Sequence, residues 1–264
     1  MESLLILTQS QKSFYYKLAS DLKYALKDLT QEELWKIIKE AAKLSASTTY
    51  QKKKDSLKRT GTFLKRTYDR YNQNGIIESV KSDAIRVKDF TLALPEKAQV
   101  VYNNFIKLKR EEQIEVAVVT ILTIAIFFAS AGGTDLEGGI PDTDLAIGGL
   151  AHHRNFITHS ILIGLGIEFT GRFSILTLER IKNRMPTDRH EIWDKVYGYI
   201  DKHKEIAISA MWVGIGAHLI KDSGVFGGGV TSYKDLPISM PMEAHEGLIA
   251  ANGVASGIFG NIVK

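Results

Sequence analysis

Acidic and imidazole side chains gather at three places in the second half of this 264-residue chain. None of the seven histidines precedes His152, and the chain has no cysteine. Disulfides, cysteine-based zinc ribbons and cysteine nucleophiles are therefore excluded, and a metal site would have to use His, Asp and Glu. The three clusters contain Asp142 and Asp144 in the first, His152, His153, Arg154, Thr158, His159 and Ser160 in the second, and His218 and Asp222 in the third.

The spacing within each cluster suits a divalent cation. Asp142 and Asp144 follow glycines and a proline, and a bend there would let both carboxylates face one ion. His218 and Asp222 lie one helical turn apart and share a face. Each cluster alone also fits an ordinary role, as a turn, a hydrogen-bonded histidine or a helix end. Together they supply the ligands of a two-metal hydrolytic centre.

The surrounding sequence predicts an all-α fold. Residues 116–134 carry no charge, and their length reaches the minimum for a membrane-spanning helix. Shorter apolar stretches follow at 155–167, 206–220 and 247–263. We therefore expect a compact apolar helical bundle, and we favour a membrane-embedded bundle over the core of a soluble one. Glu168 is either a buried acid or the membrane-edge end of its helix, and we favour the edge, because Arg172 follows one turn later. His245 is expected in a surface turn.

The first half of the chain is different in charge. Residues 1–115 hold 22 Lys/Arg against 15 Asp/Glu. We predict a basic helical domain over residues 1–112 and an apolar, histidine-bearing domain over 113–264. Thr30 and Glu33 have the spacing of a capping box at a helix start. We expect helix breaks at 72–75 and 94–96.

A basic segment runs from Lys52 to Arg70 and contains Phe63 and Tyr68, with Tyr71 next to it. It admits two interpretations. It could bind anionic lipid headgroups or nucleic acid, with the aromatic rings stacking on bases. Alternatively, it is a solvated helix face whose aromatic side chains turn into a small core.

The three motifs, in order, resemble the membrane-bound metal-dependent hydrolase family (YdjM-like). The matching residues are Pro141-Asp142-x-Asp144, His153-Arg154 with Thr158-His159-Ser160, and Gly214-x-x-x-His218-Leu219-x-x-Asp222. The resemblance covers about residues 115–240. Asn155 stands where the family usually has glycine, and the stretch from His153 to His159 is one residue longer, which leaves His152 or His153 as the ligand. The resemblance implies a small helical protein of the bacterial inner membrane. A cytoplasmic location is the alternative.

The sequence thus predicts a metal-dependent hydrolase. Its substrate would be a phosphoester of a lipid or of a lipid-linked carrier, and metal-bound hydroxide would attack it. One or two ions, zinc or else manganese or magnesium, would be held by Asp142, Asp144, His153, His159, His218 and Asp222. Arg154 and Asp144 are the predicted catalytic residues, with the Arg154 fork suited to phosphate. Thr158, Ser160 and His152 would orient the ligands. The alternatives are a soluble helical zinc phosphodiesterase or nuclease, and a non-enzymatic membrane structural or effector protein.

Overall fold

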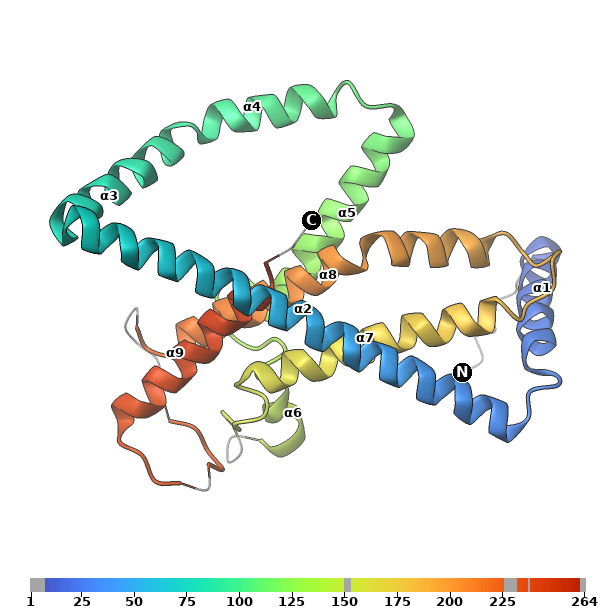
Figure 1. Ribbon diagram of the computed structural model, residues 1–264. Coiled ribbons are helices and arrows are strands. Elements are labelled where there is room, and N and C mark those ends of the chain that lie inside the picture. The colour runs from blue at the N-terminus through green and yellow to red at the C-terminus, as the bar shows by residue number, and fades with distance from the viewer. Residues whose placement is uncertain (1–7, 150–152, 226–231, 237, 262–264) are drawn as a thin grey trace, which may run out of the picture.

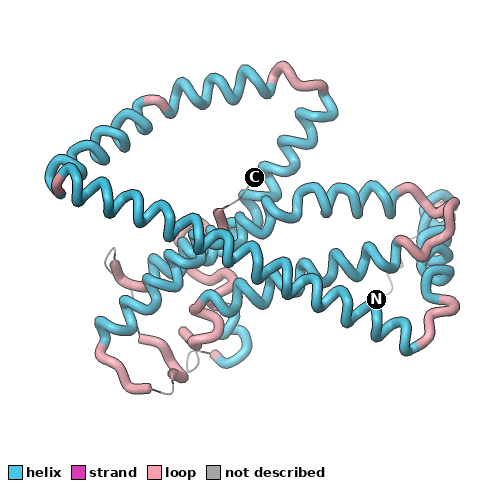
Figure 2. Tube along the Cα trace, in the orientation of Figure 1, coloured by secondary structure: helices cyan, strands magenta, loops and turns pink. Residues whose placement is uncertain are grey.

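A computed structural model describes the chain except residues 1–7, 150–152, 226–231, 237 and 262–264. The described part is built from helices, as predicted, and contains no strand; its one β-bridge joins Asn155 to Lys234. Figures 1 and 2 show long helices that cross near their middles. The helices are α1 (Gln9–Leu26), α2 (Gln31–Asn74), α3 (Ile76–Leu92), α4 (Leu94–Phe105), α5 (Arg110–Ala131), α6 (Thr143–Gly148), α7 (Ile161–Lys182), α8 (Ile192–Asp222) and α9 (Met242–Phe259).

The ends of α2 confirm the helix signals of the first half. The Thr30 side chain accepts a hydrogen bond from the Glu33 N–H, and the Glu33 carboxylate accepts one from the Thr30 N–H. At the other end Gly75, with φ of 79°, separates α2 from α3. The second predicted break separates α3 from α4, where Pro95 occupies the first turn of the new helix.

The core lies between α7, α8 and α9, with α5 packed along α8. Its fully buried side chains include Trp212, Ile215 and Leu219 on α8 and Ile249 on α9. Close packing depends on glycine: a Cβ on Gly164 of α7 would lie 2.5 Å from the Trp212 ring. The three apolar stretches predicted after residue 134 thus contribute to one core, and this core holds the ends of its helices in fixed positions.

Helix α2 packs across α7 and α9 through a buried ion cluster. Lys53 Nζ lies 2.6 Å from Glu168 Oε2 and donates to the Phe259 carbonyl oxygen. Glu168 also accepts hydrogen bonds from Arg172 and from the Trp212 indole. The prediction that Glu168 lies at a membrane edge is wrong, because Lys53, far away in the sequence, covers it. The predicted boundary between residues 112 and 113 falls in the first turn of α5. Contacts cross this boundary, because α2 of the first half packs against α7 and α9 of the second half.

Several apolar helix faces are left uncovered. Among the described residues, α5 and α7 are long and apolar enough to cross a membrane, and most of α5 is exposed. Helices α3 and α4 form an arch between α2 and α5 (Figure 1). On α2, Phe63 and Tyr68 are each 66% exposed. The interpretation that these aromatic side chains fill a small core is therefore wrong.

Candidate metal centre

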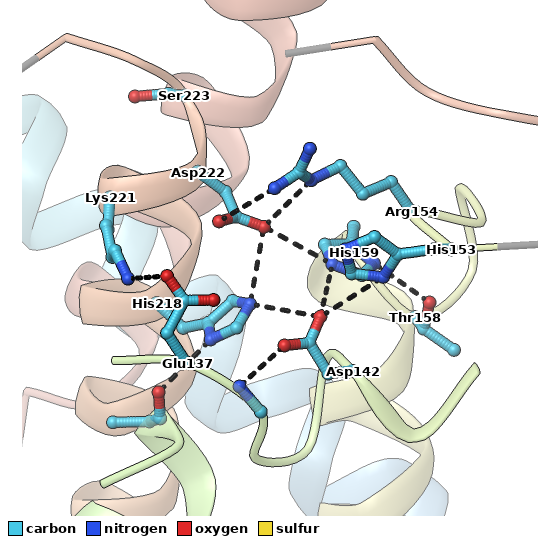
Figure 3. A network of polar contacts seen from close by, with 12 residues as sticks. Glu137, Asp142, His153, Arg154, Thr158, His159, His218, Lys221, Asp222 and Ser223 are labelled. Carbon is cyan, nitrogen blue, oxygen red and sulfur yellow. Dashed lines mark hydrogen bonds and ion pairs between the residues drawn. The ribbon is translucent and has the colours of Figure 1, made fainter. Parts of the chain in front are cut away.

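The three clusters meet where α5 ends, α7 begins and α8 ends. Figure 3 shows side chains from all three clusters in one network of polar contacts. The loop after α5 carries Asp142, and Asp144 lies in the first turn of α6. A turn just before α7 carries His153 and His159, and the last turns of α8 carry His218 and Asp222. The predicted convergence is confirmed, because these six residues form two groups whose candidate ligand atoms lie within 4.8 Å of one another.

The first group contains four buried residues: Asp142, His159, His218 and Asp222. His159 Nε2 lies 3.2 Å from Asp142 Oδ1 and 3.4 Å from Asp222 Oδ2. His218 Nε2 lies 3.6 and 3.3 Å from the same two oxygen atoms. Two carboxylates and two imidazoles therefore point at one small space.

The second group contains Asp144, His153 and His159. His153 Nδ1 lies 3.5 Å from Asp144 Oδ1 and also 3.5 Å from Asp142 Oδ1. His159 belongs to both groups: its Nε2 faces the first, and its Nδ1 lies 3.4 Å from Asp144 Oδ2. The two groups therefore overlap at His159, whose neutral ring can bind an ion through one nitrogen at a time.

Hydrogen bonds with the backbone orient two ligands of the first group. His218 Nδ1 lies 3.1 Å from the Ala131 carbonyl oxygen, so a proton on Nδ1 is donated there and Nε2 is left to bind an ion. The Gly138 N–H donates to Asp142 Oδ2 at 2.7 Å, which leaves Oδ1 facing the centre. Lys221 fastens the same loop to α8 through Glu137 and the Asp135 carbonyl oxygen.

Asp144 is held by the turn before α7. Its Oδ2 accepts hydrogen bonds from the Asn155 N–H at 2.9 Å and from the Thr158 hydroxyl at 2.8 Å. The Thr158 oxygen also lies 3.1 Å from His159 Nδ1, as predicted for a residue that orients an imidazole. Asp144 Oδ1 remains free to bind an ion.

Arg154 closes one side of the centre. Its Nε and Nη2 donate to the two oxygen atoms of Asp222 at 3.2 and 3.4 Å. Its φ of 67° is a left-handed backbone conformation that L residues rarely adopt. This strained backbone conformation directs the Arg154 guanidinium toward Asp222, and such strain is typical of functional sites.

The carboxylates and imidazoles shift one another's pKa. Burial acts to raise the pKa of Asp142 and Asp222, but contacts with His159 and His218 outweigh it and hold both pKa values well below normal. Burial likewise acts to lower the pKa of His218, but its contacts with Asp142 and Asp222 raise that pKa to about 9. The pKa of His159 is also raised above its usual value, since its contacts with the same carboxylates outweigh burial. The raised pKa values of His159 and His218 favour protonated rings beside the carboxylates, and a bound cation would replace these protons.

The centre fits a divalent ion in two respects. Asp144 Oδ1, His153 Nδ1 and His218 Nε2 are buried atoms without a hydrogen-bond partner. Such atoms are costly to bury unless something binds them. The mixed oxygen and nitrogen donors also suit zinc or manganese better than calcium or magnesium, which favour all-oxygen sites.

One predicted residue differs from the expectation, and another lies outside the described residues. Ser160 lies in the same turn, but its hydroxyl accepts a hydrogen bond from the Leu162 N–H and caps α7 instead of orienting an imidazole. The reason is that Ser160 is the last extended residue before the helix, where a hydroxyl fits the unpaired N–H groups. His152 lies outside the described residues, whereas His153 contacts both Asp142 and Asp144.

A layer behind the ligands was missed. The Tyr233 hydroxyl donates to the His159 carbonyl oxygen at 2.6 Å, and Asn252 on α9 donates to that hydroxyl. The prediction that His245 lies in a surface turn is wrong: it is buried in α9 and its Nδ1 accepts from the Tyr233 N–H. The helical continuation of 242–259 around His245 was the available signal. Tyr233 offered none, because its partners lie far away in the sequence.

Comparison of the chain with family models, curated proteins and solved structures finds no match. The resemblance to the membrane-bound metal-dependent hydrolases therefore stays a hypothesis.

Proposed function

We propose that this protein is a metal-dependent hydrolase of phosphoesters. The observation that supports this most directly is the pair of donor groups that share His159. Three further observations agree with it: buried ligand atoms without a partner, three carboxylates in one small space, and an arginine beside them. A cluster with this much negative charge is stabilised by a cation.

The residues of the chain have distinct roles in this proposal. Asp142, His159, His218 and Asp222 hold one ion, and Asp144 and His153 complete the second position beside His159. A bound divalent ion would lower the pKa of a water molecule and so supply a nucleophile near neutral pH. When the second position is empty, Asp144 Oδ1, which lacks a hydrogen-bond partner, would instead accept a proton from the attacking water.

Arg154 binds the substrate in this scheme. A guanidinium has five N–H donors, and two of those of Arg154 are engaged by Asp222. The other three are available to the oxygen atoms of a phosphoryl group, whose shape and charge the planar fork matches. Arg154 therefore favours a phosphoester over a neutral ester.

We further propose that the enzyme acts at a membrane, on a phosphoester of a lipid or lipid-linked carrier. The support is α5, whose long apolar surface is largely exposed beside the centre. A helix of 22 residues is about 33 Å long, comparable with the hydrocarbon layer of a bilayer. In the family that the sequence resembles, this membrane is the bacterial inner membrane.

The test is hydrolysis by the full-length chain, purified in detergent and loaded with Zn²⁺ or Mn²⁺. Substrates should include bis-p-nitrophenyl phosphate, p-nitrophenyl phosphate and lysophosphatidic acid. We expect metal-dependent turnover that falls at least about 100-fold in His159→Ala and Asp222→Asn. His203→Gln is the matched control, since His203 lies in the first half of α8, away from the centre, and pairs with Glu115 of α5. A chain that binds metal without hydrolysing any of these substrates would favour the non-enzymatic alternative.

A further inference from the structure

The second half of α2 carries an uncovered apolar stripe that continues a buried face. In the first half, Ala41, Ser45 and Lys53 lie buried against α7 and α9. Phe63 follows Ser56 by seven residues and Leu64 follows Lys53 by eleven, so both lie on that same side of the helix. Beyond Ser56, α7 and α9 no longer cover this side, and Leu64 is 58% exposed. The exposed stripe consists of Leu57, Phe63, Leu64 and Tyr68. Tyr71 follows on the same side, but it is half-buried and its hydroxyl donates to Asp83 of α3, which also accepts from Arg70.

Charged residues are sorted around this stripe. At 100° per residue, the lysines fall on one flank and the arginines on the other, while the acidic residues fall on the side opposite the stripe. Six basic residues and two acidic residues lie between positions 54 and 74. The lysines are Lys54, Lys58 and Lys65, the arginines Arg59, Arg66 and Arg70, and the acidic residues Asp55 and Asp69.

We propose that this half of α2, residues 57–74, docks onto an anionic lipid surface. Apolar side chains would enter the bilayer boundary, and the basic residues on both flanks would meet the headgroups. The acidic residues on the far side would face water. This goes beyond the proposed hydrolase activity, and it is independent of whether the metal centre is catalytic.

Two other occupants fit the same face less well. A second copy of the helix would bring basic flanks against basic flanks, whereas paired helices need complementary charges there. Nucleic acid binding calls for cations and stacking rings on one face. Here the stripe contains the aliphatic side chains Leu57 and Leu64, which offer no ring, and the cations point to two sides. The exposed apolar surface of α5 gives an independent reason to expect lipid nearby.

The chain has no cysteine, so a single engineered thiol can report on the position of the helix. Leu64→Cys places a probe on the stripe, and Thr62→Cys places one on the opposite side; both positions are exposed. Each variant of the full-length protein would carry an environment-sensitive fluorophore such as NBD. It would then be reconstituted into vesicles of phosphatidylcholine alone or with one quarter phosphatidylglycerol.

In vesicles with phosphatidylglycerol, we expect the probe at 64 to emit at shorter wavelength and to be quenched by spin labels on acyl chains. The probe at 62 should keep an aqueous emission and be quenched by iodide. Replacing Lys58, Arg59, Lys65 and Arg66 with glutamine should weaken docking by about fivefold per residue. The probe at position 64 should then return to an aqueous emission. Exchanging Lys12 and Lys23 of α1 and Lys27 directly after it, which are also exposed, for glutamine is the control and should change nothing.

Four results would overturn the proposal. The probes at 62 and 64 could behave alike, or position 64 could be equally shielded in vesicles of phosphatidylcholine alone. Shielding that disappears on dilution would assign the face to a second copy of the chain. Shielding that requires an oligonucleotide and not lipid would assign it to nucleic acid. A salt titration of the Leu64→Cys protein, with all its lysines and arginines present, tests the electrostatic contribution to docking, because salt screens charge–charge attraction. His159→Ala should leave all these readouts unchanged, which separates this proposal from the hydrolase.

Discussion

Metal binding at the four-residue group should release a proton, and the affinity should therefore rise with pH. The His218 pKa of about 9 means that its imidazole carries a proton at neutral pH in the metal-free chain. An ion needs the neutral imidazole, so at pH 7, two units below that pKa, displacing the proton costs about 2.7 kcal/mol. The apparent affinity at pH 7 is then about 100-fold weaker than with a neutral imidazole.

Calorimetric titration with Mn²⁺ between pH 6 and pH 8 tests this. The whole range lies below the His218 pKa, so the apparent Kd should fall about tenfold per pH unit for one proton. If His159, whose pKa is also raised, gives up a second proton, the slope should be steeper. Repeating the titration in buffers of different ionisation enthalpy counts the protons. His203→Gln should leave the count unchanged. A Kd that does not vary with pH would refute the proposed competition between proton and metal.

The same protonation governs the stability of the metal-free chain. The His218 pKa lies above its usual value of 6.5, so this contribution is complete below pH 6.5 and is lost as the pH rises through about 9. The loss should approach about 3 kcal/mol. The pKa of Asp222 is lowered, so its contribution is present above 3.8 and is lost as the pH falls. Thermal melting should therefore show a metal-free optimum between about pH 4 and 6.5. The Mn²⁺-loaded chain should keep its stability at pH 8, and equal pH profiles with and without Mn²⁺ would contradict this.

Three further substitutions test the supports of the centre and of the fold. Gly139→Ala should weaken Mn²⁺ binding more than Gly138→Ala. A Cβ at 139 would lie 2.5 Å from the nitrogen of Gly132, whereas a Cβ at 138 would meet no atom within 4 Å. Equal binding constants would contradict the proposed role of the loop. Lys53→Ala should lower the free energy of unfolding by about 3 kcal/mol in a chemical denaturation, and its exposed neighbour Lys54→Ala, the control, by less than about 0.5 kcal/mol. Tyr233→Phe should lower it by about 1 kcal/mol and weaken Mn²⁺ binding in the same titration, since the hydroxyl holds the turn before α7; unchanged values would rule out that support.

The sequence predicted the parts of the centre that depend on local spacing. Glycines and a proline before Asp142 indicated a turn, and the four-residue interval from His218 to Asp222 indicated a shared helix face. The sharing of His159 between two groups could not be predicted, because it depends on how α5, α7 and α8 pack. That packing depends on close contacts such as that of Gly164 with Trp212.

The errors have a common physical origin in partners that are distant in sequence. Glu168 was assigned to a membrane edge from its neighbours on α7, but Lys53 of α2 covers it. His245 was assigned to a turn from the nearby proline, but its contact with Tyr233 buries it. Conversely, the basic flanks of α2 were visible in the sequence, whereas the exposure of the stripe between them was not.

The central claim is that the two donor groups bind divalent ions, and elemental analysis of the purified full-length chain tests it most directly. We expect between one and two zinc or manganese ions per chain, and almost none in His159→Ala, because His159 belongs to both groups. His203→Gln should retain the full content. A chain that contains no transition metal, and takes up none when Zn²⁺ or Mn²⁺ is added, would contradict the account.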